Sequence, residues 1–185
     1  KETGDAYADA QCRHVLGNID DSVGRFDSAV DNLNAAFDFY RYGGYRTWEA
    51  YALNSMGHAN FELGNIDLAE IQFEKALSMF REDANTYGAG MALANQAKIA
   101  RNREDFGSAR CLFQESLTMR WEHQDRIGLM GCLRGLGQVE ALIGRHASAA
   151  RLFGAADALR EAIGAELPRP RSRYTGAVAA VRQQL

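Results

Sequence analysis

Hydrophobic positions follow helical spacing along the chain, and their pattern repeats every forty residues. The rows of this repeat align without gaps and start at Ala10, Ala50, Gly90 and Met130. The twentieth column is always alanine, at Ala29, Ala69, Ala109 and Ala149. The twenty-fourth column is large and apolar, at Leu33, Phe73, Phe113 and Phe153. Chance does not align this many columns, so the sequence predicts copies of one structural unit.

Each copy contains two helical blocks separated by a short break. In the second copy these blocks cover about 49–63 and about 67–82. Gly64 and Asn65 stand between them, a pair typical of a helix C-terminus. The sequence therefore predicts four helix-turn-helix units, which cover about 10–49, 50–89, 90–129 and 130–167.

Small residues predict how the two helices of a unit pack. The eighth column holds Gly17, Gly57, Ala97 and Gly137. We expect Gly57 and Ala69 to let two helix backbones approach closely, with Leu53 and Phe73 filling the space beside them. A unit with one apolar face on each helix cannot bury both faces alone, so neighbouring units are expected to stack into a solenoid.

The two ends of the chain depart from the repeat. Residues 1–9 fit the end of a preceding unit and the start of the first helix, and Lys1 in place of Met suggests a piece of a longer protein. Pro168 and Pro170 interrupt the helical pattern after the fourth unit. A last helix at about 171–185, with Tyr174, Val178 and Val181 on one face, is expected to cap that unit.

Composition supports a helical protein without a membrane span. The hydrophobic fraction is 46%, prolines are few, and alanine is abundant. No apolar run approaches the ~20 residues that a membrane span needs. Because no charged-then-apolar leader opens the sequence, we expect no signal peptide. The cysteines Cys12, Cys111 and Cys132 lack CxxC spacing, so we interpret them as reduced thiols of a cytoplasmic protein.

Charge divides the chain into an acidic and a basic part. Residues 1–89 contain 7 Lys and Arg against 15 Asp and Glu, whereas residues 90–185 contain 14 against 9. Such an asymmetry fits end-to-end contact with other parts of a larger chain. It also fits a polar partner that bridges both ends, and both interpretations stay open here.

A resemblance to the tetratricopeptide repeat is carried by the pattern Leu53-x-x-Met56-Gly57, Gly64-x-Ile66 and Ala69-x-x-x-Phe73-x-x-Ala76-Leu77. It implies an all-α fold, a right-handed α-α superhelix of four helix-turn-helix units with a C-terminal capping helix. The forty-residue period and the missing closing proline, with Arg81 in its place, depart from the usual repeat. This long form resembles the arrays of bacterial LuxR-type and SARP-type regulators and of signal-transduction ATPases with numerous domains (STAND ATPases).

No catalytic, cofactor or metal motif is evident. The chain lacks HExxH, GxSxG and P-loop patterns. The pair Asp20 and Asp21 could form a catalytic dyad, but adjacent helical residues point in different directions, so we expect both to end a helix in solvent. Cys12 shares a column with Ala52, which indicates a packing position rather than a nucleophile.

Metal and nucleic-acid partners are weakly supported. His14 and His58 lie on first helices of adjacent units, but no carboxylate or cysteine stands at ligand spacing to them. The arginines of the C-terminal part are spread over several helices and the net charge is −3, so we do not expect DNA or RNA binding. Trp48 and Trp121 lie near unit boundaries and are expected to be structural.

The resemblance implies a concave groove lined by the first helices of successive units. Its candidate partner-binding residues are His14, Asn18, Tyr51, Asn54, His58, Glu62, Met91, Asn95, Lys98, Asn102, Arg134 and Gln138. Amides such as Asn54, Asn95 and Gln138 suit the backbone of a bound peptide. Ordinary solvated helix faces are the alternative.

The function expected from these observations is a non-enzymatic interaction or scaffold module without cofactors. It would bind a protein segment, or another domain of its own chain, as the sensor or partner-binding part of a bacterial regulator or signalling ATPase. The alternatives are a homodimerisation module and an arm that senses a small molecule.

Overall fold

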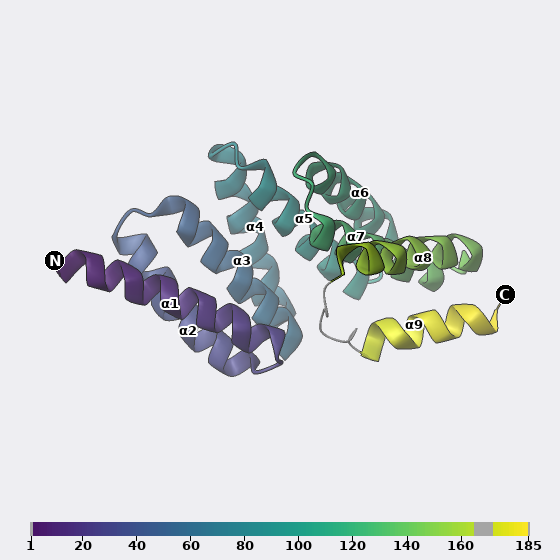
Figure 1. Ribbon diagram of the computed structural model, residues 1–185, viewed down its shortest axis with the longest axis horizontal. Coiled ribbons are helices and arrows are strands. Elements are labelled where there is room, and N and C mark those ends of the chain that lie inside the picture. The colour runs from purple at the N-terminus through teal and green to yellow at the C-terminus, as the bar shows by residue number, and fades with distance from the viewer. Residues whose placement is uncertain (1, 165–171, 185) are drawn as a thin grey trace. The chain divides into compact units, whose positions relative to one another are not determined.

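The computed structural model describes residues 2–164 and 172–184, with side chains from residue 5 to 164 and from 175 to 184. Within these ranges the chain forms helices joined by turns, without a strand (Figure 1). The helices are α1 Glu2–Ser22, α2 Phe26–Tyr42, α3 Arg46–Leu63, α4 Ile66–Glu82, α5 Thr86–Asn102, α6 Phe106–Glu122, α7 Arg126–Leu142, α8 His146–Ile163 and α9 Ser172–Gln183. The predicted all-α helix-turn-helix solenoid is confirmed.

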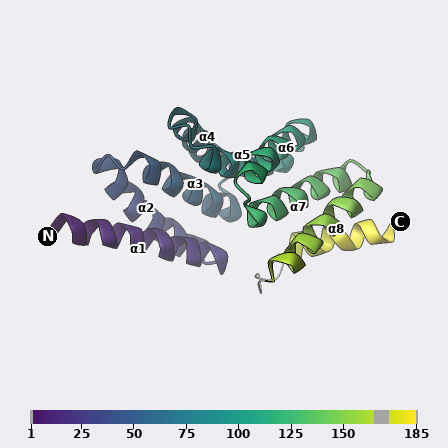
Figure 2. The ribbon, with the colours of Figure 1, turned by 45° about the horizontal axis from the view of Figure 1, so that its top comes forward.

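The chain divides into two compact units, Lys1–Asn95 and Gln96–Leu185. In the first unit α2 packs between α1 and α3, and α3 packs against α4. In the second unit α7 packs between α6 and α8, and α9 packs against α8 and α7 (Figure 2). Consecutive helices are therefore neighbours in space within each unit, as expected of a stacked array.

Helix α9 covers the apolar side of α8. Val181 is buried with Ala149 and Phe153, and Val178 packs against the same cluster. This contact is the one predicted for a capping helix. Pro168, Pro170 and the side chain of Tyr174 lie outside the described residues.

The turns recur every twenty residues, at half the period of the sequence pattern. A residue with a left-handed backbone stands in each, at Gly24, Gly44, Gly64, Ala84, Glu104, Gln124, Gly144 and Gly164. In the turn of Gly64, the amide of Asn65 donates to the carbonyl of Asn60 at 2.9 Å, closing a Schellman-type cap. Turns inside a helix-turn-helix unit and turns between successive helix-turn-helix units therefore share one backbone geometry.

Side chains cap some of the following helices. The Asp105 carboxylate accepts from the Ser108 amide at 3.0 Å, and the Asp125 carboxylate accepts from the Gly128 amide at 2.9 Å. These bonds satisfy helix N-terminal donors that would otherwise lack a partner. The first helices begin a few residues before the predicted blocks, since α3 starts at Arg46 rather than near residue 49.

Glycines of the eighth column make room for the large residue of the facing helix. A Cβ atom on Gly57 would lie 2.6 Å from the Phe73 ring, and one on Gly17 would lie 2.6 Å from Leu33. The contact is thus between a glycine and a large side chain, while Ala69 lies buried beside it. A side chain at Gly57 would displace the buried ring.

The expectation that Asp20 and Asp21 both face solvent is wrong for Asp20. Its side chain is buried and accepts hydrogen bonds from Arg25 Nε at 2.9 Å, Ser28 Oγ at 2.6 Å and Asn32 Nδ2 at 3.2 Å. The Ser28 hydroxyl, followed by the Arg25 guanidinium, lowers the pKa of this carboxyl. These hydrogen bonds therefore connect the end of α1 to α2.

Candidate functional site

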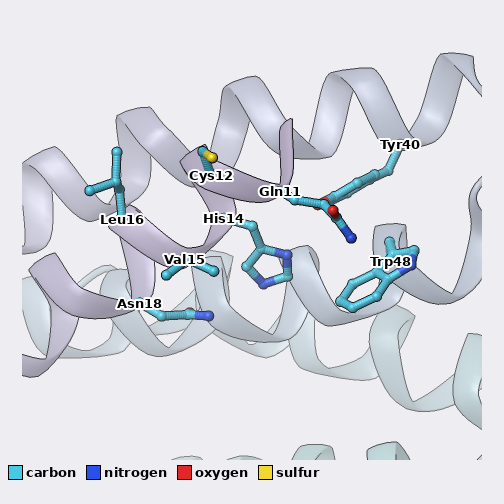
Figure 3. Close-up of a pocket in the computed structure, with 8 residues that line it drawn as sticks. All are labelled: Gln11, Cys12, His14, Val15, Leu16, Asn18, Tyr40 and Trp48. Atoms are coloured by element: carbon cyan, nitrogen blue, oxygen red, sulfur yellow. The ribbon is translucent and has the colours of Figure 1, made fainter. Parts of the chain in front are cut away.

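A pocket of about 620 Å³ opens on the first unit, among α1, α2 and the start of α3 (Figure 3). Its lining residues are Gln11, Cys12, His14, Val15, Leu16, Asn18, Tyr40 and Trp48. This volume lies within the range of about 300–1,000 Å³ that is usual for ligand sites.

One face of α1 supplies a wall of the pocket. Gln11, Val15 and Asn18 stand four and three residues apart, so they share a face of the helix. Val15 is 57% exposed although it is apolar. The amides of Gln11 and Asn18 flank it, which gives the wall an apolar centre with polar edges.

Three rings hold one another in place beside that wall. The Trp48 ring stacks on Tyr40 with centroids 6.0 Å apart, and the His14 ring meets the edge of Trp48 at 6.1 Å. His14 also lies 5.9 Å from Tyr40. Mutual packing of this kind fixes the rings, so the pocket is preformed. Trp48 stays 40% exposed and can contact a partner.

Two residues of the pocket lining, His14 and Tyr40, are buried and carry polar groups. Burial lowers the pKa of His14, so its imidazole is neutral at pH 7. Burial, followed by the nearby Tyr7 hydroxyl, raises the pKa of Tyr40 to about 12. Within the described residues the Tyr40 hydroxyl has no hydrogen-bond partner. An unpaired buried hydroxyl is costly.

Metal ligands and thiols are two further kinds of group that bear on the chemistry of the described residues. The described part of the chain contains no cluster of three or more His, Cys, Asp or Glu side chains fit to hold a metal ion. The buried thiol of Cys132, in the other unit, has its pKa raised by burial, which disfavours a thiolate. Among the described helices, none is long and apolar enough to cross a bilayer.

The predicted groove residues of the first unit have different environments. His14 and Asn18 line the pocket. The amides of Asn54 and Asn95 are buried and bond each other at 3.1 Å, so they connect α3 and α5. His58 Nδ1 lies 2.8 Å from the Asp21 carboxylate of α1.

Further groove residues of this unit also contact protein groups. The Tyr51 hydroxyl accepts from Asn85 Nδ2 at 3.2 Å. Glu62 lies 3.9 Å from His58 Nε2, and Met91 is half-buried. Of the eight predicted residues in the first unit, the pocket thus gathers His14 and Asn18, and the other six lie outside its lining.

The second unit holds the remaining predicted residues. The Gln138 amide oxygen accepts from Arg101, and Arg134 lies 3.8 Å from the Asp157 carboxylate. Lys98 is half-buried, and Asn102 is exposed near the end of α5. These four residues do not belong to the lining of the pocket.

A smaller pocket of about 380 Å³ lies in the second unit, and its lining is mostly polar. Its buried centre is Glu140, whose carboxylate lies 3.5 Å from Arg110 and 3.8 Å from Arg145. This carboxylate offsets the charge of the two arginines. The pocket is therefore a weaker candidate for an anionic ligand than its arginines alone suggest.

Sequence reasoning missed most of the pocket. Val15 is not among the predicted groove residues, and the sequence predicts only a structural role for Trp48. The spacing of Gln11, Val15 and Asn18 on one helical face is a signal that could have found the first wall. No sequence signal brings Tyr40 of α2 and Trp48 of α3 to that wall, since tertiary packing does so.

Comparison with solved structures supports the fold. BtubC (BKLC) from P. vanneervenii is similar over 88% of this chain and 67% of its own, with 20% identity and a TM-score of 0.66. Aspartyl phosphate phosphatase F from Bacillus subtilis matches 86% of this chain and 42% of its own, with 15% identity and a TM-score of 0.73. The apo form of RapI matches 94% of this chain and 47% of its own, with 15% identity and a TM-score of 0.68.

The chain spans less than half the length of the last two proteins. At these identities the likeness concerns the fold alone. No curated protein has a sequence that matches this chain. The family model of the tetratricopeptide repeat matches residues 16–82 and 48–120, which together cover more than half of the sequence. The chain belongs to the tetratricopeptide repeat family.

Proposed function

We propose that this protein is a non-enzymatic interaction module that binds a segment of a partner protein, or of another domain of its own chain. The pocket of the first unit carries the proposal. It combines an exposed apolar wall with two buried polar groups, the His14 imidazole and the Tyr40 hydroxyl. Tetratricopeptide arrays are interaction scaffolds, which agrees with such a role.

An apolar side chain of the partner is the expected anchor. Seated between Val15 and Trp48, it would bury surface on both sides, and such burial contributes about 1.5–3 kcal/mol for one large side chain. The amides of Gln11 and Asn18 can bond the backbone of the bound segment. Further contacts must come from the neighbouring helix faces, because one anchor alone gives weak affinity.

The biological setting belongs to the same proposal. The forty-residue form of the repeat resembles the arrays of LuxR-type and SARP-type regulators and STAND ATPases, and two similar structures are RapI and an aspartyl phosphate phosphatase. We place the module in the cytoplasm as the sensor or partner-binding part of a bacterial regulatory protein. The unpaired, exposed thiols of Cys12 and Cys111 fit a reducing compartment.

A small molecule is the second candidate ligand. The volume of the pocket, about 620 Å³, favours it, because a cavity of this size can enclose a compact ligand. In this form the module would sense a metabolite with an apolar body and one hydrogen-bonding group.

A peptide array of random dodecamers tests the first candidate. Wild type is compared with Val15→Glu, which puts a charge in the pocket. Ile71→Glu is the matched control, since Ile71 on α4 is 62% exposed in the same unit and outside the pocket. We expect at least tenfold weaker binding for Val15→Glu and none of this loss for Ile71→Glu. If both variants lose peptide binding equally, or if neither loses it, binding at this pocket is contradicted. Native mass spectrometry tests the second candidate, and a compound retained by the protein would favour it.

A further inference from the structure

An apolar stripe runs along the outer side of α1. It consists of Cys12, Leu16 and Ile19, which stand four and three residues apart and so share one helical face, and of Val23, which follows directly after the helix. Leu16 is 50% exposed, Ile19 is 48% exposed and Val23 is 58% exposed. A helix of a folded protein seldom leaves such a continuous apolar face in water.

The corresponding face of α3 shows what covers the first three of these positions inside the array, whereas Leu63, the counterpart of Val23, is 38% exposed. Forty residues after Cys12, Leu16 and Ile19 stand Ala52, Met56 and Ala59, and all three are buried. Ala52 packs in one cluster with Ala36 and Tyr40 of α2, and Met56 packs in another with Leu33 of α2. The second helix of the preceding helix-turn-helix unit thus covers this face.

The second compact unit repeats the arrangement independently. On α7 the same positions are Cys132, Leu136 and Val139, which are also buried. The Cys132 sulfur lies 3.2 Å from the Ser116 hydroxyl of α6. Ser116 occupies the repeat position of Ala36, so both units pair the same two positions of the repeat.

We propose that the stripe on α1 is a docking surface for the second helix of a further helix-turn-helix unit. Its occupant is an amphipathic helix with a large apolar residue and, three residues later, a small residue, as Leu33 and Ala36 on α2 or Phe113 and Ser116 on α6. The small residue lies against Cys12. This surface adjoins the proposed partner site, since Cys12 and Leu16 belong to both, whereas Ile19 and Val23 lie outside the pocket lining.

Charge and packing argue against a second copy of α1 as the occupant. Helix α1 contains five acidic residues and one arginine, so two copies face to face would repel. The same charge disfavours an anionic lipid surface. Helices α2 and α8 cannot serve in a second copy, because each is already packed between two neighbours. A neutral or basic helix from another unit fits the stripe best.

Site-directed disulfide capture tests the proposal. The probe is a synthetic peptide with the sequence of α6, residues 106–122, which carries two arginines and two glutamates. It contains Cys111→Ser and Ser116→Cys, and its cysteine is activated as the 2-thiopyridyl disulfide. The thiolate of Cys12 attacks the peptide sulfur, a new disulfide forms, and pyridine-2-thiolate leaves.

Cys111 of the protein serves as an internal reference, because it is also exposed but lies outside the stripe. We expect the peptide to raise the ratio of Cys12 to Cys111 labelling at least tenfold above the ratio given by 2,2′-dithiodipyridine. Peptide mapping by mass spectrometry measures both ratios. A control peptide with cysteine in place of Thr118, an exposed position of α6, should lose this preference.

Two variants distinguish docking of the peptide on the stripe from binding in the pocket. Ile19→Asp should abolish the preference for Cys12, since Ile19 belongs to the stripe but not to the pocket lining. Val15→Glu should leave it within twofold, and circular dichroism verifies that both variants are folded. Equal ratios for peptide and reagent, or a ratio that Ile19→Asp does not change, overturn the proposal. So does a wild-type dimer in sedimentation that Ile19→Asp dissociates.

Discussion

At the scale of single residues, the turns show a local conflict between sequence and backbone. Ala84, Glu104 and Gln124 adopt φ values of 50°, 62° and 54°, a region that glycine occupies in the other turns. The left-handed conformation costs a residue with a Cβ about 1–2 kcal/mol. The array thus accepts strain in its middle turns to keep one turn geometry.

Relief of this strain is measurable. We expect Glu104→Gly to raise the free energy of unfolding by about 1 kcal/mol and Gly144→Ala, where φ is 79°, to lower it by a similar amount. Urea denaturation monitored by circular dichroism gives both values. Gln114→Gly, inside α6, is the control and should destabilise by about 1 kcal/mol. Destabilisation by Glu104→Gly contradicts the prediction.

The raised pKa of Tyr40 predicts a loss of stability at alkaline pH. Its pKa is about 12 in the folded chain against 10.0 for an ordinary tyrosine, so the unfolded chain releases this proton first. Stability from this group is complete below pH 10 and is lost as the pH rises toward 12. Denaturation midpoints across this range should fall more steeply for wild type than for Tyr40→Phe. Parallel profiles exclude a contribution from Tyr40.

The lowered pKa of His14 predicts a loss of stability at acidic pH. Burial lowers its pKa below the ordinary value of 6.5, so the unfolded chain binds the proton more readily. Stability from neutral His14 is therefore complete above pH 6.5 and is lost as the pH falls below it. The difference in unfolding free energy between wild type and His14→Gln should shrink from pH 7.5 to pH 5. A constant difference argues against a buried neutral imidazole.

At the scale of helices, pairs of a glycine and a large residue set the distance between the helices of a unit. Gly57→Ala should cost about 1–3 kcal/mol, because its Cβ would lie 2.6 Å from the Phe73 ring. Phe73→Leu in the same chain should recover part of this cost, since the smaller side chain leaves room. A double-mutant cycle in urea measures the coupling. Additive effects would show that the glycine serves another purpose.

At the scale of the whole molecule, the two compact units should respond separately to local damage. Most contacts join consecutive helices, so a defect spreads mainly to its neighbours. We expect Gly57→Ala to raise amide exchange in residues 1–95 roughly tenfold more than in 96–185. Gly137→Ala should do the reverse, and hydrogen exchange with mass spectrometry follows both. Equal increases in both ranges indicate one cooperative unit.

Much of the helical architecture could be predicted from the sequence, and the site only in small part. The columns at Ala69 and Phe73 predict a buried helix face, and both residues are buried. The turns at Ala84, Glu104 and Gln124 carry no glycine, so the twenty-residue period was not visible. The prediction that Asp20 faces solvent is wrong, because spacing on one helix does not show contacts with Ser28 and Asn32 on the next helix.

The sequence by itself determined the repeat, the helix-turn-helix unit and the apolar faces that stack, because periodicity is a property of neighbours along one chain. Tertiary structure alone decided which polar residues bond each other, as Asn54 and Asn95 do. It also brought Tyr40 and Trp48 to the wall of α1 and left the stripe around Ile19 uncovered. These outcomes depend on distances between separate helices, and a linear pattern does not contain such distances.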